Sequence, residues 1–253
     1  MKAPSGRLVL VPNGLDLGTD CEVDLREVVP DRVFRRAAGI EHWVVENAKS
    51  ARAFLKRVGQ LVPLCVPLQA MKIVELPRLQ KGGGGAAKPL DHLLAPALAG
   101  HDVGLLSEAG LPAVADPGAA LVEAAHRLGL GVLPLSGPSS LMLALAASGL
   151  NGQSFTFVGY LPVDNAGRGG RIRELDQVSR RQAQTQIAIE TPYRNLALFH
   201  ALLAHLQPST RLCVASGLTL PSGWCRTLDV QAWRQAPAAL GDTTPAVFLW
   251  LAR

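Results

Sequence analysis

The chain has 253 residues, of which 48% are hydrophobic and 18% charged, and its formal net charge at pH 7 is +5. This composition is typical of a core-forming globular protein and excludes a disordered chain. The length accommodates two domains of ordinary size. The apolar run near the start is too short for a signal peptide and no stretch is long enough to span a membrane, so we expect a cytoplasmic protein without a membrane segment.

Short apolar runs alternate with helical patterns through the first 149 residues. We expect strands at 7–11, 41–47, 64–68, 103–109 and 131–137, and helices at 50–59, 89–100, 117–129 and 138–149. Such alternation favours crossover connections and a mainly parallel sheet with helices on both faces. Glycines at 100, 129 and 149 mark helix ends, because glycine adopts the left-handed conformation without a steric penalty.

The pattern changes after Gly149. Here we expect strands at 154–162, 185–192, 211–219, 224–230 and 246–252, and helices at 168–181 and 193–207. Consecutive strands between 211 and 230 indicate a hairpin and hence a mixed sheet with helices. The sequence therefore predicts two α/β lobes, an N-terminal lobe of residues 1–149 and a C-terminal lobe of residues 150–253, with a ligand cleft between them.

Several common kinds of site are not indicated. The four cysteines stand far apart without a CxxC pair, so we expect free thiols, and the six histidines lack metal-ligand spacing. The segment KGGGG, residues 81–85, lacks the Lys-Ser/Thr pair of a phosphate loop and is expected to be a flexible connection. No GxGxxG follows the first strand, which disfavours a dinucleotide oxidoreductase.

Four loops lead from a strand to a helix: VPNGLDLG (11–18), SEAGLPAVADPG (107–118), SGPSS (136–140) and ETPYR (190–194). In an open parallel sheet, ligands bind beyond the carboxyl ends of the strands, where such loops converge and helix N-termini present free N–H groups. The loop at 107–118 is much longer than a strand-to-helix turn needs. We therefore expect it to do more than reverse the chain.

The stretches SEAGLPAVADPG, VLPLSGPSSLMLALAASGL (132–150), FVGYLP (157–162) and IETPYRNL (189–196) resemble the tetrapyrrole methylase superfamily of S-adenosylmethionine-dependent methyltransferases. Within it, they are most similar to the ribosomal RNA small subunit methyltransferase I group, from about Val103 to Leu198. The resemblance implies a two-lobe α/β enzyme, usually a homodimer, that binds S-adenosylmethionine in the cleft and needs no metal. It also implies RNA or a ribosomal subunit as partner.

The resemblance further implies that the 107–118 loop encloses the cofactor. The residues expected to bind the cofactor are Gly14, Ser107, Gly110, Leu111, Val114, Ser139, Ser140, Thr191, Ala215, Pro245 and Ala246. If the acceptor is a hydroxyl group, a base helps to remove its proton. Glu46 and Glu190 are the expected catalytic carboxylates, with Glu108 as a further candidate.

Two departures from the ribosomal group bear on the acceptor. That group has an acidic pair beginning EDT where this chain has Glu46 and Asn47, and a charged stretch thought to face the substrate where this chain has SGLTL, residues 216–220. The motifs expected to bind the cofactor therefore agree with those of the group better than the motifs expected to face the acceptor. A small tetrapyrrole-like acceptor remains an alternative, as does a cofactor-binding protein that has lost catalysis.

Some of these residues also have purely structural interpretations. Glu190 fits equally a carboxylate paired with Arg194 at a helix start. Glu108 is expected to order its own loop by accepting backbone hydrogen bonds, and Asp116 to cap the helix that follows. The arginine-rich stretch 167–182 fits either a solvated helix face or a surface that follows phosphates.

Overall fold

The computed structural model describes residues 5–16, 18, 19, 21–77 and 90–253. Contacts divide them into two units. The first unit contains the described residues up to Asp16 and from Val23 to Pro138, and the second contains those from Gly18 to Glu22 and from Ser139 onward. Each unit carries a five-stranded sheet. The KGGGG segment lies outside the described residues.

The sheet of the first unit is entirely parallel. Its strands are β1 (Arg7–Val11), β2 (His42–Val45), β3 (Lys72–Glu75), β4 (Val103–Leu106) and β5 (Gly131–Pro134). They are ordered β3-β2-β4-β1-β5, and every neighbouring pair runs in the same direction. The predicted parallel sheet is confirmed. Because β1 lies between β4 and β5, the loops after these three strands leave the sheet side by side.

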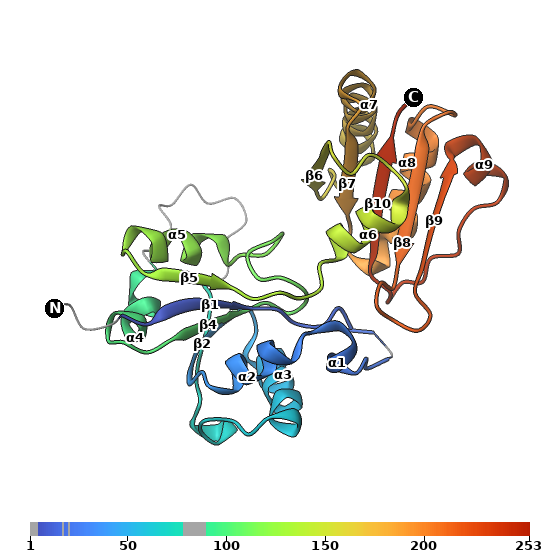
Figure 1. Ribbon diagram of the computed structural model, residues 1–253. Coiled ribbons are helices and arrows are strands. Elements are labelled where there is room, and N and C mark those ends of the chain that lie inside the picture. The colour runs from blue at the N-terminus through green and yellow to red at the C-terminus, as the bar shows by residue number, and fades with distance from the viewer. Residues whose placement is uncertain (1–4, 17, 20, 78–89) are drawn as a thin grey trace. The chain divides into compact units, whose positions relative to one another are not determined.

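Both faces of this sheet are covered, because alternate side chains of a strand point to opposite faces. Val9, Trp43 and Leu106 pack in one buried cluster with α1 (Leu25–Val28), α2 (Asp31–Ala38) and α3 (Ala48–Leu61). Leu8 and Leu105 pack in the other with the 3-10 helix Asp91–Leu94, α4 (Ala95–Leu98) and α5 (Ala119–Arg127). Figure 1 shows α5 and the α2–α3 pair on opposite sides of the strands.

Two predictions for the first unit are wrong, and two of its helices were missed. Residues 64–68 form no strand, because prolines at 63 and 67 cannot donate to a ladder, and the third strand is β3 instead. The helix expected at 89–100 is, in its described part, a 3-10 turn followed by the single turn α4, since Pro96 lacks the N–H of a continuous helix. The short helices α1 and α2 were not predicted.

The second sheet is mixed, as predicted. Its strands are β6 (Phe155–Gly159), β7 (Thr185–Ile189), β8 (Arg211–Ser216), β9 (Trp224–Asp229) and β10 (Ala246–Leu251), ordered β6-β7-β10-β8-β9. β6 and β7 are parallel, and the other pairs are antiparallel, including the predicted β8–β9 hairpin. The carboxyl ends of β7 and β8 and the start of β10 therefore lie at one edge.

Helices cover both faces of this sheet as well. α7 (Asn165–Gln182), α8 (Asn195–His205) and α9 (Val230–Gln235) pack on one face around Phe199, Trp233 and Trp250. α6 (Ser140–Ser148) packs on the other through Leu141, Ala144 and Leu145. Figure 1 shows α6 against β10 and β8. The sequence assigned 138–149 to the first lobe, but this packing places α6 with the second unit.

A glycine in β4 tests the packing of the first unit. A Cβ at Gly104 would lie 2.6 Å from the ring of Trp43, which is 1% exposed. We expect Gly104→Ala to lower the free energy of unfolding by about 1–3 kcal/mol, because a buried indole cannot move without overpacking the core. Urea denaturation measures the change.

Gly170→Ala is the matched control. Gly170 lies in α7, and a Cβ there meets nothing within 4 Å. Alanine at this position should stabilise the protein by about 0.5–1 kcal/mol through helix propensity. An unchanged midpoint for Gly104→Ala would contradict the packing described for β2 and β4.

Candidate functional site

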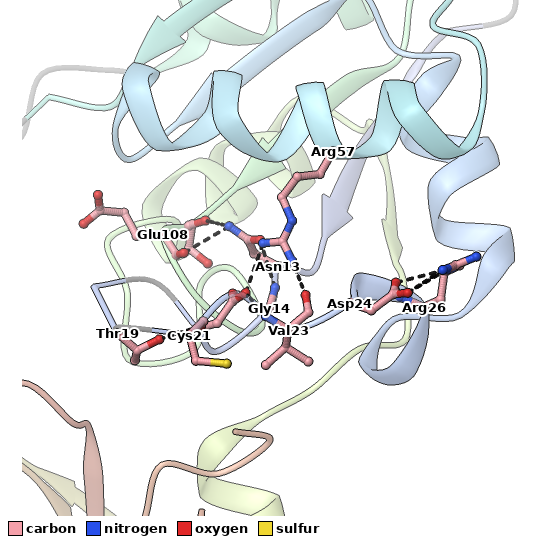
Figure 2. A network of polar contacts seen from close by, with 11 residues as sticks. Asn13, Gly14, Thr19, Cys21, Val23, Asp24, Arg26, Arg57 and Glu108 are labelled. Carbon is pink, nitrogen blue, oxygen red and sulfur yellow. Dashed lines mark hydrogen bonds and ion pairs between the residues drawn. The ribbon is translucent and has the colours of Figure 1, made fainter. Parts of the chain in front are cut away.

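The loops after β1 and β4 are joined at the carboxyl edge of the first sheet. The Asn13 N–H donates to Gly110 O at 2.9 Å, and the Gly110 N–H donates to Gly14 O at 3.2 Å. The Asn13 side chain spans the same gap, because its Nδ2 donates to Glu108 O at 3.0 Å and to Ser107 O at 3.4 Å. Figure 2 shows Asn13 pointing toward Glu108. Gly14, Ser107 and Gly110, predicted as cofactor residues, are thus brought together.

The loop after β5 lies against the same turn. A Cβ at Gly137 would be 2.2 Å from the Cβ of Pro12, and one at Gly110 would be 3.5 Å from Pro138 O. No side chain at Gly137 fits so close to Pro12. The backbones of three of the four predicted loops therefore meet beyond β4, β1 and β5.

Part of the 107–118 loop has a strained backbone. Gly110, Ala113 and Ala115 all have positive φ, of 68°, 67° and 64°. An alanine in this region costs on the order of 1 kcal/mol or more, and such residues cluster at ligand-binding loops. Between the two alanines, Val114 is 45% exposed, although it is apolar. The strain thus presents a predicted cofactor residue to solvent, and Leu111 precedes it as a half-buried neighbour.

A pocket of about 520 Å³ opens between this loop and the segments that follow β2 and β3. Its lining consists of Glu46, Asn47, Leu76, Pro77, Glu108, Ala115, Asp116 and Pro117. These residues follow β2, β3 and β4, so the pocket belongs to the same edge of the sheet. Glu46, a predicted catalytic residue, is held in its wall by accepting the Glu108 N–H at Oε2, at 3.1 Å.

Three carboxylates, those of Glu46, Glu108 and Asp116, face this pocket, and none of the lining residues that the structure describes is a cation. Burial, followed by repulsion from Glu46 and Glu108, raises the pKa of Asp116 to about 6, against a smaller opposing effect of a hydrogen bond with Ser107. Burial and the charge of Glu46 also raise the pKa of Glu108, while a hydrogen bond with Ser50 lowers it. A pKa raised toward the operating pH suits a group that exchanges protons in general acid–base catalysis.

The structure corrects two assignments in this loop. Asp116 does not cap α5, because the N-cap residue is Gly118 and no side chain bonds to the first turn. The loop is ordered by the carboxylate of Glu46 and the amide of Asn13, which bond to its backbone, rather than by the Glu108 side chain. The alternation in the sequence places Asn13 and Asp116 in loops, but nothing in it indicates that Asn13 bonds to Ser107 and Glu108 or that Asp116 lies near Glu46.

The remaining predicted residues belong to the second unit. Ala215 pairs with Val247, and Pro245 O accepts the Gly217 N–H at 2.9 Å, so Ala215, Pro245 and Ala246 lie together at one edge of the sheet. Thr191 follows β7 at this edge. Thr227 donates to Ser148 O and Arg211 donates to Gly149 O, so the end of α6 lies toward the start of β8, at the opposite edge of the sheet. The start of α6, with Ser139 and Ser140, therefore points toward the edge where Ala215 and Pro245 lie.

Two of these side chains have structural partners. Glu190 is 8% exposed, and its Oε2 forms an ion pair with Arg194 Nη2 at 2.9 Å. The ion pair with Arg194, which was predicted as the structural alternative to a catalytic role, is therefore present. The Oε1 atom of Glu190 also accepts the Thr191 N–H at 2.9 Å. Ser139 is the N-cap residue of α6 and accepts from the Met142 N–H. A catalytic role for Glu190 stays a prediction.

The arginine-rich stretch forms most of α7. Arg168 is buried and donates to the carbonyls of Pro162 and Val163, so it fastens the start of the helix. Arg180 and Arg181 are exposed near its end. Within the described residues there is no group of three or more His, Cys, Asp or Glu side chains suited to a metal ion, and none of the described helices is long and apolar enough to span a membrane.

Solved structures share this fold. The methyltransferase CobJ gives a TM-score of 0.58 over 98% of this chain and 100% of its own, at 17% identity. Uroporphyrin-III C-methyltransferase from Thermus thermophilus, complexed with S-adenyl homocysteine, gives 0.51 over 97% of each chain at 19% identity. The predicted tetrapyrrole methylase fold is confirmed.

Sequence comparison with curated proteins finds relatives of one named group. The chain is similar to ribosomal RNA small subunit methyltransferase I of Vibrio cholerae, with 37% identity over 122 residues, 48% of this chain and 41% of the relative. The enzyme of the same name from Mesorhizobium japonicum is 37% identical over 140 residues, 55% and 46% of the two chains. These alignments span less than half of each relative. No family model matches the chain. The similarity to this group is as predicted.

The raised pKa of Asp116 gives a test of the pocket. Because the fold favours the neutral acid, the charged form reduces stability above pH 6, and this loss disappears below the ordinary pKa of 3.8. A shift of this size corresponds to roughly 3 kcal/mol, which solvent screening of a partly accessible carboxylate reduces to about 1 kcal/mol. We expect Asp116→Asn to gain that amount at pH 7.5 and to gain nothing at pH 3.5.

Urea denaturation at the two pH values measures this effect. Asp31→Asn is the control, because the side chain of Asp31 is 76% exposed and does not line the pocket. It should show no comparable gain at pH 7.5. A gain for Asp116→Asn that is equal at both pH values would contradict the assigned origin of the shift.

Proposed function

We propose that the protein is an S-adenosylmethionine-dependent methyltransferase of the tetrapyrrole methylase type that acts on ribosomal RNA. The observation that carries the proposal is the junction of three loops beyond β4, β1 and β5, made by Asn13, Gly110 and Gly137. The fold of known methyltransferases and the names of the curated relatives support it.

The residues present fit such a cofactor. Val114 is an exposed apolar side chain held out by two strained alanines, and it offers contact to a ligand with apolar surface. The glycines at 14, 110 and 137 keep the neighbouring backbone free of side chains. These are the residues of the first unit that would hold the cofactor, together with Ser107 and Leu111. Those of the second unit would be Ser139, Ser140, Thr191, Ala215, Pro245 and Ala246.

S-adenosylmethionine supplies, when bound, a methyl group that is already activated. The chain's own residues then need to orient the acceptor and take up its proton. Positioning of two reacting groups contributes about 7–11 kcal/mol to lowering a barrier when they are well aligned. Glu46 is the proposed proton acceptor, fixed by the Glu108 N–H, and Asp116 beside it exchanges protons near neutral pH.

The names of the relatives and the charge of α7 support ribosomal RNA as the acceptor class. The curated relatives are named for ribosomal RNA, and α7 exposes arginines that suit phosphates. A small tetrapyrrole-like acceptor is the second candidate, because the solved neighbours include a methyltransferase named for uroporphyrin III. The carboxylate-lined pocket fits the N–H or O–H groups of either acceptor, but it repels phosphates.

A homodimer in the cytoplasm completes the proposal. Tyr160, Val163, Tyr193 and Leu196 are apolar or aromatic and between 44% and 72% exposed. They follow the adjacent ends of β6 and β7, so they form one surface that a second copy would cover. Multi-angle light scattering would measure the subunit number.

The four cysteines are free thiols, as in reducing compartments.

Cofactor binding is the direct test of the activity class. A ligand at about 100 times its dissociation constant adds roughly 2.7 kcal/mol to the free energy of unfolding. We expect S-adenosylmethionine and S-adenosylhomocysteine each to raise the melting temperature by several degrees, and NAD to leave it unchanged. The absence of a shift with both sulfur compounds would remove the proposal.

Salt dependence tests RNA as the acceptor. Each phosphate contact on single-stranded RNA contributes about 0.7 to the slope of log affinity against log salt. We expect Arg180→Gln and Arg181→Gln each to reduce that slope by up to this amount. Arg35→Gln, at a 74% exposed arginine of α2, is the control and should leave the slope unchanged. Equal slopes for all four proteins would favour a small acceptor.

A further inference from the structure

A second set of polar contacts, made with α3, also holds the loop after β1. Arg57, on α3, forms an ion pair with Asp16, with Nη1 and Oδ2 3.1 Å apart. The other guanidinium nitrogen of Arg57 donates to Val23 O. Asp16 Oδ2 also accepts the Val23 N–H at 3.0 Å. Arg57, Asp16 and Val23 are therefore bonded to one another in a closed triangle, which we call the Arg57 clasp.

The clasp is well shielded from water. The side chain of Asp16 is 8% exposed and that of Arg57 is 20% exposed. A charged pair in such surroundings is screened less than one at the surface, and removing one partner leaves the other buried without compensation. Arginine is suited to this place because its planar guanidinium bonds a carboxylate and a carbonyl in fixed directions at once.

The clasp also determines the shape of the turn at Gly14. A Cβ at Gly14 would lie 2.7 Å from Asp16 Oδ1, so the carboxylate held by Arg57 occupies the space of a side chain there. The adjacent backbone of Asn13 and Gly14 bonds to Gly110 on its other side. Figure 2 shows Arg57 reaching down from its helix toward Val23, beside Asn13 and Gly14. The turn is thus fixed between the clasp and the 107–110 loop.

We propose that Arg57 is a positioning residue for cofactor binding, which acts by clasping Asp16 and Val23 and so fixing the Gly14 turn against the Gly110 loop. Arg57 itself need not touch the cofactor. The inference rests on the proposed function, because it takes Gly14, Ser107 and Gly110 as cofactor residues.

The test compares two guanidinium–carboxylate pairs of the same unit. Arg36 bonds to Asp102, which also accepts the Arg7 N–H at 2.8 Å. Arg7 begins β1 and Asp102 precedes β4, so this pair lies at the edge of the sheet opposite to the loops. Arg36→Met is therefore a control that removes a similar pair away from the site.

Isothermal titration calorimetry with S-adenosylhomocysteine gives the main readout. We expect Arg57→Met to raise the dissociation constant at least tenfold, and Arg57→Lys to raise it two- to fivefold, because an ammonium group reaches Asp16 without also holding Val23 O. Arg36→Met should stay within twofold of the wild type, even where it lowers the melting temperature as much. A dissociation constant within twofold of the wild type for folded Arg57→Met would overturn the inference.

Hydrogen exchange of Arg57→Lys covers the case in which Arg57→Met does not fold. The N–H groups of Gly14, Val23 and Gly110 should exchange faster than in the wild type, while those of β1 and β4 stay protected. Unchanged exchange at all three would overturn the inference. A wild type that does not bind S-adenosylhomocysteine would instead refute the proposed function, and the exchange result would still decide whether the clasp fixes the turn.

Discussion

The hydrogen bonds of Asn13 and Gly14 to the loop after β4 are the central constraint in the first unit. The strands end at this edge, and the Asn13 amide provides a hydrogen-bond donor to the carbonyls of Ser107 and Glu108 beyond them. Once these bonds fix the start of the 107–118 loop, the rest of it follows a strained path past Gly110 and Ala115. Asp116 takes its position from that path, whereas Glu46 reaches the loop from the end of β2 by accepting the Glu108 N–H.

Stability and function are in tension at this edge. Left-handed alanines, an exposed valine and neighbouring carboxylates each raise the free energy of the folded state. The sheet compensates, because its inner strands β1, β2 and β4 are largely buried. Gly104 in β4 and Gly137 after β5 also let Trp43 and Pro12 pack closely. A rigid parallel sheet that supports strained loops is the usual arrangement of an α/β binding site.

The sequence predicted the sheets and the loops better than the contacts within the site. Alternating apolar runs located all five strands of the second sheet. The apolar run 64–68 is not a strand, because Pro67 interrupts it and Pro63 precedes it. Asp116 before Pro117 has the pattern of a helix cap, yet tertiary burial turned it toward the pocket. The pair of Arg57 and Asp16 is 41 residues apart, so only the folded chain reveals it.

The packing of α6 has a consequence for dividing the chain. Its residues Leu141, Ala144 and Leu145 are buried against strands of the second sheet. A fragment that stops at Gly149 would carry this helix without the surface that shields it, and so would be prone to aggregate. A fragment that stops at Pro138 would keep β5, the last strand of the first sheet, and would not contain the apolar helix α6. Anyone expressing the halves separately should therefore cut before Ser139.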